Sequence, residues 1–287
     1  MSRLLTRTNR HISLLWALLL ITSAATAKDR DPAKLMAAMQ DAMVPTQSQL
    51  TRVAVSLYKD GAQEATRTWQ ALVARQRFDD GPRTAIAMMA PETARGSAML
   101  TAPRPDDGDV GLWLFSPSER RARQLAPLEA DRHFLVTDFN YGVLGLTERR
   151  FVEPRLLGEE IIDGRKTWKV EVAPADDWYY SRIVTWIAQD TMLPLKREYY
   201  DRAFRLWKVV DVRDAIVDDV PTVLGMQIRD VQTNSRSDWE VRAVSYDARG
   251  VDKADLSATA LGELPQQPFW QVVGYSHDGP VAAALAN

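Results

Sequence analysis

The sequence contains no cysteine and only three histidines in 287 residues. Without cysteine the chain can form no disulfide, thiolate zinc site or iron–sulfur cluster, and it has no cysteine nucleophile. An excess of positive charge is also missing, because 36 Lys and Arg stand against 38 Asp and Glu. Nucleic-acid binding, which requires such an excess, is therefore not expected. A hydrophobic content of 46% argues against intrinsic disorder.

The common active-site motifs are absent as well. The sequence has no G-x-S-x-G, H-E-x-x-H, P-loop or G-x-G-x-x-G pattern. His277 lies near the C-terminus, and we interpret His133 as a polar residue beside a helix rather than as a base. Adjacent carboxylates such as Asp79-Asp80 fall mostly at turns, which favours solvated loop charges. We expect no catalytic residue, metal site or cofactor, with an exported hydrolase that uses two carboxylates as the alternative.

Residues 1–27 have the pattern of an export signal. Three arginines precede an apolar run from Ile12 to Ile21, and Ala25-Thr26-Ala27 fits a cleavage site. The run is short for a membrane span, so an N-terminal anchor is the less favoured interpretation. Because no cysteine follows, a lipid anchor is not expected. Cleavage after Ala27 removes three arginines and leaves a net charge of about −5 on a protein that we expect in the periplasm.

One helix and many strands are predicted for the rest of the chain. Asp31-Pro32 is a typical helix start, Pro45 ends the pattern, and between them Leu35, Met36, Met39 and Met43 form an apolar stripe. From Val53 onward the apolar residues alternate, which predicts short antiparallel strands. Besides two strands joined by a turn at 59–61, strands are expected at 83–89, 95–101, 110–116, 121–126, 166–173, 181–188, 194–201, 204–213, 222–234 and 238–246.

Some strands are apolar on both faces. Leu112 and Leu114 alternate with Trp113 and Phe115, so each face of this strand requires an apolar environment. Either helices pack on one face, or one face lines a cavity of the size of a lipid. We also expect a short helix at 138–147 with Asp138 as its N-cap, and a loose tail at 263–287.

A cluster of basic residues follows this apolar strand at Arg120, Arg121 and Arg123. If the segment is an edge strand, its charges prevent pairing with another sheet. If it faces a ligand, arginine can bind a phosphate or carboxylate through two hydrogen bonds. The sequence leaves both interpretations open.

Several stretches, in this order, resemble the LolA-like outer membrane lipoprotein-sorting family over about residues 30–255. They follow the amphipathic first helix and are YKDG at 58–61, Pro91 with RGS at 95–97, LWLFSP at 112–117, TDFNY at 137–141, LPLK at 193–196 and EYYD at 198–201. The sequence is most similar to the branch whose members accompany inner-membrane transporters of the RND/MMPL type.

This resemblance implies an α+β fold, an open antiparallel half-barrel sheet wrapped around a few helices, over residues 28–262. It implies a carrier that binds acyl chains of a lipid or lipoprotein, with an RND/MMPL-type transporter as partner and only transient membrane contact. An accessory subunit that docks on the transporter and carries nothing is a further alternative. The candidate cavity residues are Met36, Met39, Met43, Trp113, Phe115, Phe134, Phe139 and Tyr141. Arg120, Arg121 and Arg123 are candidates for headgroup or partner contact.

Overall fold

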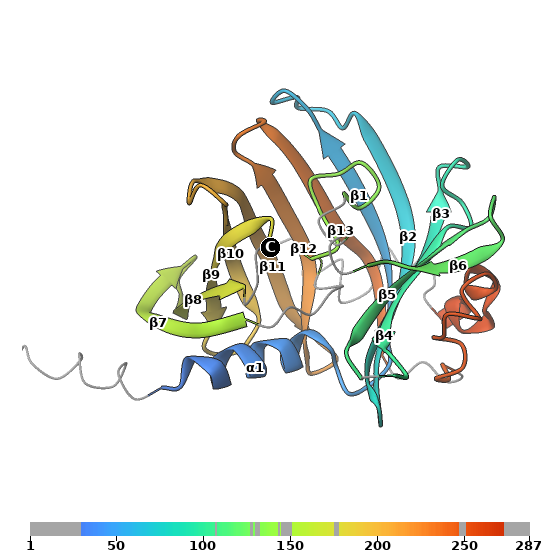
Figure 1. Ribbon diagram of the computed structural model, residues 1–287, viewed down its shortest axis with the longest axis horizontal. Coiled ribbons are helices and arrows are strands. Elements are labelled where there is room, and N and C mark those ends of the chain that lie inside the picture. Colours follow the sequence, from blue (N-terminus) through green and yellow to red (C-terminus); the bar gives the residue numbers. More distant parts are fainter. Residues whose placement is uncertain are drawn as a thin grey trace, which may run out of the picture.

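The computed structural model describes residues 30–106, 108–126, 129, 133–142, 144, 151–174, 178–246 and 251–272. Within these residues the chain forms one α-helix and a single sheet of 13 strands (Figure 1). The expected signal peptide at 1–27 lies outside the described residues, as does His277. None of the helices in the described part is long and apolar enough to cross a membrane.

The predicted first helix is confirmed as α1, Pro32–Met43. The Asp31 carboxylate accepts a hydrogen bond of 2.9 Å from the backbone N–H of Ala33, and proline occupies the first helical position. The chain becomes extended at Val44, directly before Pro45. The stripe of Leu35, Met36 and Met39 is buried, so α1 lies with its apolar side against the sheet.

The strands that follow all pair antiparallel with their neighbours. Their bounds are β1 Gln49–Tyr58, β2 Arg67–Phe78, β3 Gly81–Ala90, β4 Ala98–Pro103, β5 Val110–Ser116, β6 Arg121–Gln124, β7 Phe151–Ile162, β8 Arg165–Pro174, β9 Tyr180–Ala188, β10 Pro194–Asp201, β11 Leu206–Val217, β12 Val220–Asp230 and β13 Ser235–Tyr246. Each strand predicted from the sequence overlaps one of these.

The order of strands in the sheet is β6-β5-β4-β3-β2-β1-β13-β12-β11-β10-β9-β8-β7. Two runs of consecutive strands are therefore joined by one long-range pairing, in which Val55 of β1 lies opposite Trp239 of β13. β6 and β7 are the two edges, and the sheet does not close (Figure 1). The predicted open antiparallel sheet is confirmed.

β7 is absent from the sequence prediction. Its sequence, FVEPRLLGEEII, contains Pro154 and Gly158, and its pairing with β8 shifts register between Val152 and Arg155 and again between Leu156 and Gly158. Proline and bulges are tolerated on an edge strand because one side makes no ladder hydrogen bonds. These features hide the alternation that identifies the other strands.

Each face of the sheet carries its own apolar cluster. On the face that we call the inner face, Val53, Val73 and Ile86 pack with α1 and with strands from both halves of the sheet. On the outer face, the side chains that point the other way from β2, β3 and β4, such as Leu72 and Leu100, form a second cluster. This explains strands that are apolar on both sides.

The outer cluster is covered by the C-terminal segment Val251–Val272. Leu264, Phe269 and Trp270 are buried in it, and the indole Nε1–H of Trp270 donates to the backbone oxygen of Leu264 at 2.7 Å. Short 3-10 helices occur at Leu264–Gln266 and Pro268–Val272. The prediction of a loose tail from residue 263 is therefore wrong for 264–270, whose apolar side chains complete a core, while 273–287 lie outside the described residues.

The segment at 133–144 packs on the inner face without forming the helix predicted at 138–147. Residues 138–142 and 144 form bends, a bridge and a turn, and the other predicted positions lie outside the described residues. The Asp138 carboxylate accepts hydrogen bonds from the hydroxyls of Ser235 and Ser237 of β13 instead of capping a helix. His133 and Asn140 form an isolated bridge. A tertiary contact has replaced the local cap.

Candidate functional site

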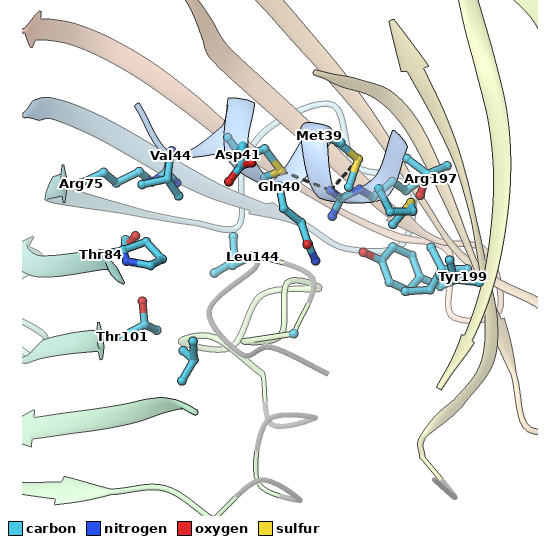
Figure 2. Close-up of a pocket in the computed structure, with 18 of the residues that line it drawn as sticks. Met39, Gln40, Asp41, Val44, Arg75, Thr84, Thr101, Leu144, Arg197 and Tyr199 are labelled. Atoms are coloured by element: carbon cyan, nitrogen blue, oxygen red, sulfur yellow. Dashed lines mark hydrogen bonds between the residues drawn. The ribbon is translucent and has the colours of Figure 1, made fainter. Parts of the chain in front are cut away.

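A cavity of about 240 Å³ lies on the inner face between α1 and the two halves of the curved sheet (Figure 2). This volume is slightly below the roughly 300–1,000 Å³ typical of small-molecule sites. Residues of α1 line one side, β2 to β5 a second, and β8 to β10 a third. Elements from both halves of the chain thus build one concave site.

The apolar part of the lining comes mainly from α1 and the strands opposite it. Met36, Met39 and Met43 all contribute, as the sequence predicted for a stripe on one helix face. Their apolar neighbours include Val44, Val110, Leu144, Val172 and Ile183. Methionine side chains are unbranched and adapt to irregular partners. This wall can therefore accept chains of varying shape.

Arg197 of β10 extends under α1. Its Nη2 lies 3.3 Å from the sulfur of Met43 and 3.7 Å from that of Met39, and it donates to both (Figure 2). The buried Nε of the same side chain has no partner in the described part of the chain. A thioether is a weak acceptor, so these contacts position the guanidinium without neutralising its charge.

A row of polar side chains crosses the inner face at one end of the cavity. We call these side chains the polar row, and their strand positions are Thr222, Tyr246, Gln49, Arg75, Thr84 and Thr101. Arg75 lies opposite Gln49 on one side and Thr84 on the other, and Thr84 lies opposite Thr101. Arg75, Thr84 and Thr101 line the cavity.

One half of the polar row is tied together by hydrogen bonds. The amide of Gln49 donates to the Tyr246 hydroxyl at 2.8 Å, and the hydroxyls of Thr222 and Tyr246 are 2.5 Å apart. Burial raises the pKa of the Tyr246 hydroxyl, which therefore stays neutral at ordinary pH. The other half consists of Arg75, Thr84 and Thr101, whose side chains face the cavity instead.

A second polar group lies deeper on the inner face and holds the segment at 133–144. The Lys208 ammonium is buried and donates to the backbone oxygen of Asp138, and Asp230 lies near it. Burial lowers the pKa of Lys208, and the two carboxylates partly oppose this effect. Lys208 and Asp138 are thus part of the structural core and not of the cavity.

Phe134 and Phe139, both predicted as cavity residues, are completely buried within the core. Their ring centroids lie 6.1 and 6.3 Å from that of Trp239. They do not line the cavity, because they fasten the 133–144 segment to β13. Here the sequence identified the correct element but not the role of its aromatic residues.

Trp113 and Phe115, also predicted as cavity residues, point to the outer face. A Cβ atom at Gly111 would lie 2.5 Å from the Trp113 ring, and one at Gly262 would lie 3.1 Å from the Phe115 ring. Both side chains pack against the cluster under the C-terminal segment. The sequence showed that β5 has two apolar faces but could not distinguish the inner from the outer one.

A second, more open pocket of about 370 Å³ lies near the edge strand β6. Tyr141, Phe115 and Arg123 contribute to it, together with polar residues such as His133 and Glu119. Arg123 is paired with Glu129 at 3.3 Å, whereas Arg121 is exposed on β6 and Arg120 lies in the turn before it at a φ of 49°. The basic cluster therefore lies on an edge strand, away from the first cavity.

Arg75, Arg197 and the threonines of the polar row are not among the cavity residues predicted from the sequence. A signal was present in β2, where Trp69, Ala71 and Val73 point to the inner face and Arg75 follows in the same alternation. A charged residue in the apolar phase of a strand is an unusual feature that could have marked it. Arg197 shows the same pattern, because it lies on the same face of β10 as Tyr199.

The fold is that of the LolA-like lipoprotein-sorting proteins. It is similar to a putative outer membrane lipoprotein-sorting protein domain from Vibrio parahaemolyticus, with a TM-score of 0.70 and 19% identity over 81% of this chain and 100% of that one. A LolA superfamily protein from Nitrosomonas europaea gives a TM-score of 0.59 and 18% identity over 79% and 97%. A DUF1329 family protein from Desulfovibrio piger gives 0.69 and 24% over 80% and 97%. The predicted LolA-like fold is confirmed.

The sequence also matches a family model. Residues 80–260, more than half of the chain, match the model of a family described as "Uncharacterized protein", and the chain belongs to that family. No curated protein matches the sequence.

Proposed function

We propose that this protein is a carrier that binds the acyl chain of a lipid or lipoprotein in the cavity under α1. The observation that carries the proposal is the apolar cavity itself, with its wall of Met36, Met39 and Met43. Burial of an acyl chain gains about 0.8 kcal/mol per methylene. A wall of adaptable side chains gives this gain without the rigid fit that would oppose release. The LolA-like fold supports the same role.

The setting that fits this role is the periplasm. With the export signal at 1–27 cleaved after Ala27, the carrier takes its cargo from an inner-membrane transporter of the RND/MMPL type and delivers it toward the outer membrane. The exposed Arg120 and Arg121 at the edge of the sheet are the proposed contacts with the transporter or with lipid headgroups. Arg123, being paired with Glu129, is a weaker candidate.

The carrier function is tested by binding of the neutral probe N-phenyl-1-naphthylamine and by native mass spectrometry of protein purified from its own cell envelope. The wild type should bind the probe and retain lipid. Met36→Glu should weaken probe binding at least about 10-fold, because it places a carboxylate against the apolar cargo. Ala37→Glu, on the exposed side of the same helix, should bind like the wild type.

The proposal is overturned if the wild type neither binds the probe nor retains lipid. Hydrolysis of envelope glycans or lipids by such a protein would then favour the enzyme, and tight association with a transporter would favour the accessory subunit. Equal effects of Met36→Glu and Ala37→Glu would show that probe binding occurs away from this cavity.

A further inference from the structure

Arg75 carries a positive charge that no carboxylate of the described residues pairs with. It reaches the cavity from β2, and the polar row gives it a glutamine, a tyrosine and threonines as neighbours, all uncharged. Burial lowers the pKa of its guanidinium, but arginine remains charged in proteins. The charged guanidinium is therefore partly shielded from water, which is energetically unfavourable unless an anionic group pairs with it.

The lining as a whole has a positive balance. Among the described residues, three arginines and one carboxylate contribute to it, namely Arg75, Arg77, Arg197 and Asp41. Asp41 lies 3.0 Å from Arg77, a pair at the solvent-exposed side of α1. Within the described residues the guanidinium of Arg197 donates to the sulfurs of Met39 and Met43 and forms no ion pair. The chain as a whole has more acidic than basic residues. The positive lining is thus a property of this site and not of the composition.

The hydroxyls of Thr84 and Thr101 extend this charge along the sheet. Thr84 lies opposite Arg75, and Thr101 lies opposite Thr84 on the next strand. Both threonines are buried and line the cavity. Guanidinium and hydroxyl groups are donors that match the oxygens of a phosphate or carboxylate. The apolar wall of Met36, Met39 and Ile183 lies in the same cavity. One end of the site suits an anion and the other an acyl chain.

We propose that the cargo is an anionic amphiphile whose phosphate or carboxylate binds Arg75 while its acyl chain lies along α1. This inference rests on the proposed carrier function and narrows it, because it excludes neutral lipids as the preferred cargo. Thr84 and Thr101 donate to the same anion. Arg197, which the sulfurs of Met39 and Met43 position, lies on the other side of the acyl chain from Arg75. No covalent step is required.

The test compares lipids that share one chain and differ in charge. Displacement of N-phenyl-1-naphthylamine from the full chain is measured with monopalmitoylglycerol and with palmitoyl lysophosphatidic acid, each below its micelle concentration, and with palmitate as the carboxylate form. The wild type should bind both anionic lipids about 10-fold more tightly than the neutral one, as a charge-assisted hydrogen-bonded contact allows. Inorganic phosphate alone should displace nothing.

The matched variants are Arg75→Gln and Arg67→Gln, since Arg67 lies exposed on the same strand. Arg75→Gln should bind the anionic lipids no more tightly than monopalmitoylglycerol, and a far-UV circular dichroism spectrum and an unfolding midpoint like those of the wild type show that it is folded. Arg67→Gln should keep the preference, and Arg75→Lys should keep part of it because the charge remains without the planar fork.

Equal binding of neutral and anionic lipids by the wild type would overturn the inference and leave the carrier function standing. So would a preference that survives in Arg75→Gln. Competition by inorganic phosphate against lysophosphatidic acid would show that free phosphate is the ligand, which also overturns it. A wild type that binds no lipid of either kind would instead overturn the proposed function.

Discussion

At the scale of single residues, charge is placed in two distinct ways on the inner face. Lys208 is buried, donates to the backbone oxygen of Asp138 and lies near two carboxylates, so it stabilises a segment of the core. Arg75 is surrounded by neutral polar groups and faces a cavity. A buried positive charge thus lies near carboxylates in one case, whereas in the other no carboxylate of the described residues pairs with it.

Lys208 should make stability depend on pH in the alkaline range. Its pKa in the folded protein is below its ordinary value of 10.5. Between these two values the unfolded chain binds more protons than the folded one, so stability rises with pH. The free energy of unfolding of the wild type, relative to Lys208→Met, should therefore increase as the pH rises toward and through 10.5, in total by about 1.4 kcal/mol for each unit by which the pKa is lowered.

Urea denaturation at a series of pH values measures this difference. Lys166→Met is the control, because Lys166 is exposed on β8 and should show the same pH dependence as the wild type. Parallel curves for the wild type and Lys208→Met would contradict the assigned burial.

At the scale of elements, the C-terminal segment acts as a cover on the outer face. Arg83 of β3 donates to the backbone oxygen of Leu256 at 2.9 Å and pairs with Asp80 at 2.7 Å. Lys253 bridges Asp79 and Asp80, and these contacts raise its pKa. The segment is thus joined to the β2–β3 turn by polar contacts and to the sheet by Phe269 and Trp270.

Truncation of the anchor in this segment should affect stability but not binding. Trp270→Ala removes a buried indole and should lower the free energy of unfolding by about 3 kcal/mol. Probe affinity should stay within about twofold, because the segment lies on the face opposite the cavity. Gln271→Ala, at an exposed neighbour, should change stability by less than about 0.5 kcal/mol. A large loss of probe binding in Trp270→Ala would show that the two faces are coupled.

The sequence predicts the positions of the strands better than it predicts what packs against each face of them. In β1 and β5 the alternation of side chains between the two faces identifies the strands. In β7 this alternation is interrupted by Pro154 and Gly158, which an edge strand tolerates. Local signals also fail at Asp138, whose carboxylate binds serines 97 and 99 residues away. The inner position of Arg75 and the outer position of Trp113 depend on which face α1 covers, which no local pattern contains.

At the scale of the whole molecule, the two runs of strands share one core. The inner cluster contains Trp69 of β2 and Trp168 of β8, which come from different halves of the sheet, and the halves meet at β1 and β13. Because neither half encloses its own inner face, the chain should unfold in one cooperative step.

Tryptophan fluorescence and far-UV circular dichroism should then give the same midpoint in guanidinium chloride. Val55→Ala, at the junction with Trp239, should shift both midpoints equally, with a loss of roughly 2 kcal/mol. Two separated transitions, or a shift seen by one probe alone, would show that the halves are independent domains.

The cover on the outer face has a mechanical consequence. The strands β2 to β4 are packed on both sides, by the inner cluster and by the C-terminal segment, whereas the outer face of β8 to β10 carries charged pairs such as Lys169 with Glu160 and Lys196 with Glu198. Strands that are packed on both faces deform less easily than strands that are packed on one face. When a bulky ligand enters the cavity, we therefore expect β8 to β10 to move outward while β2 to β4 stay in place.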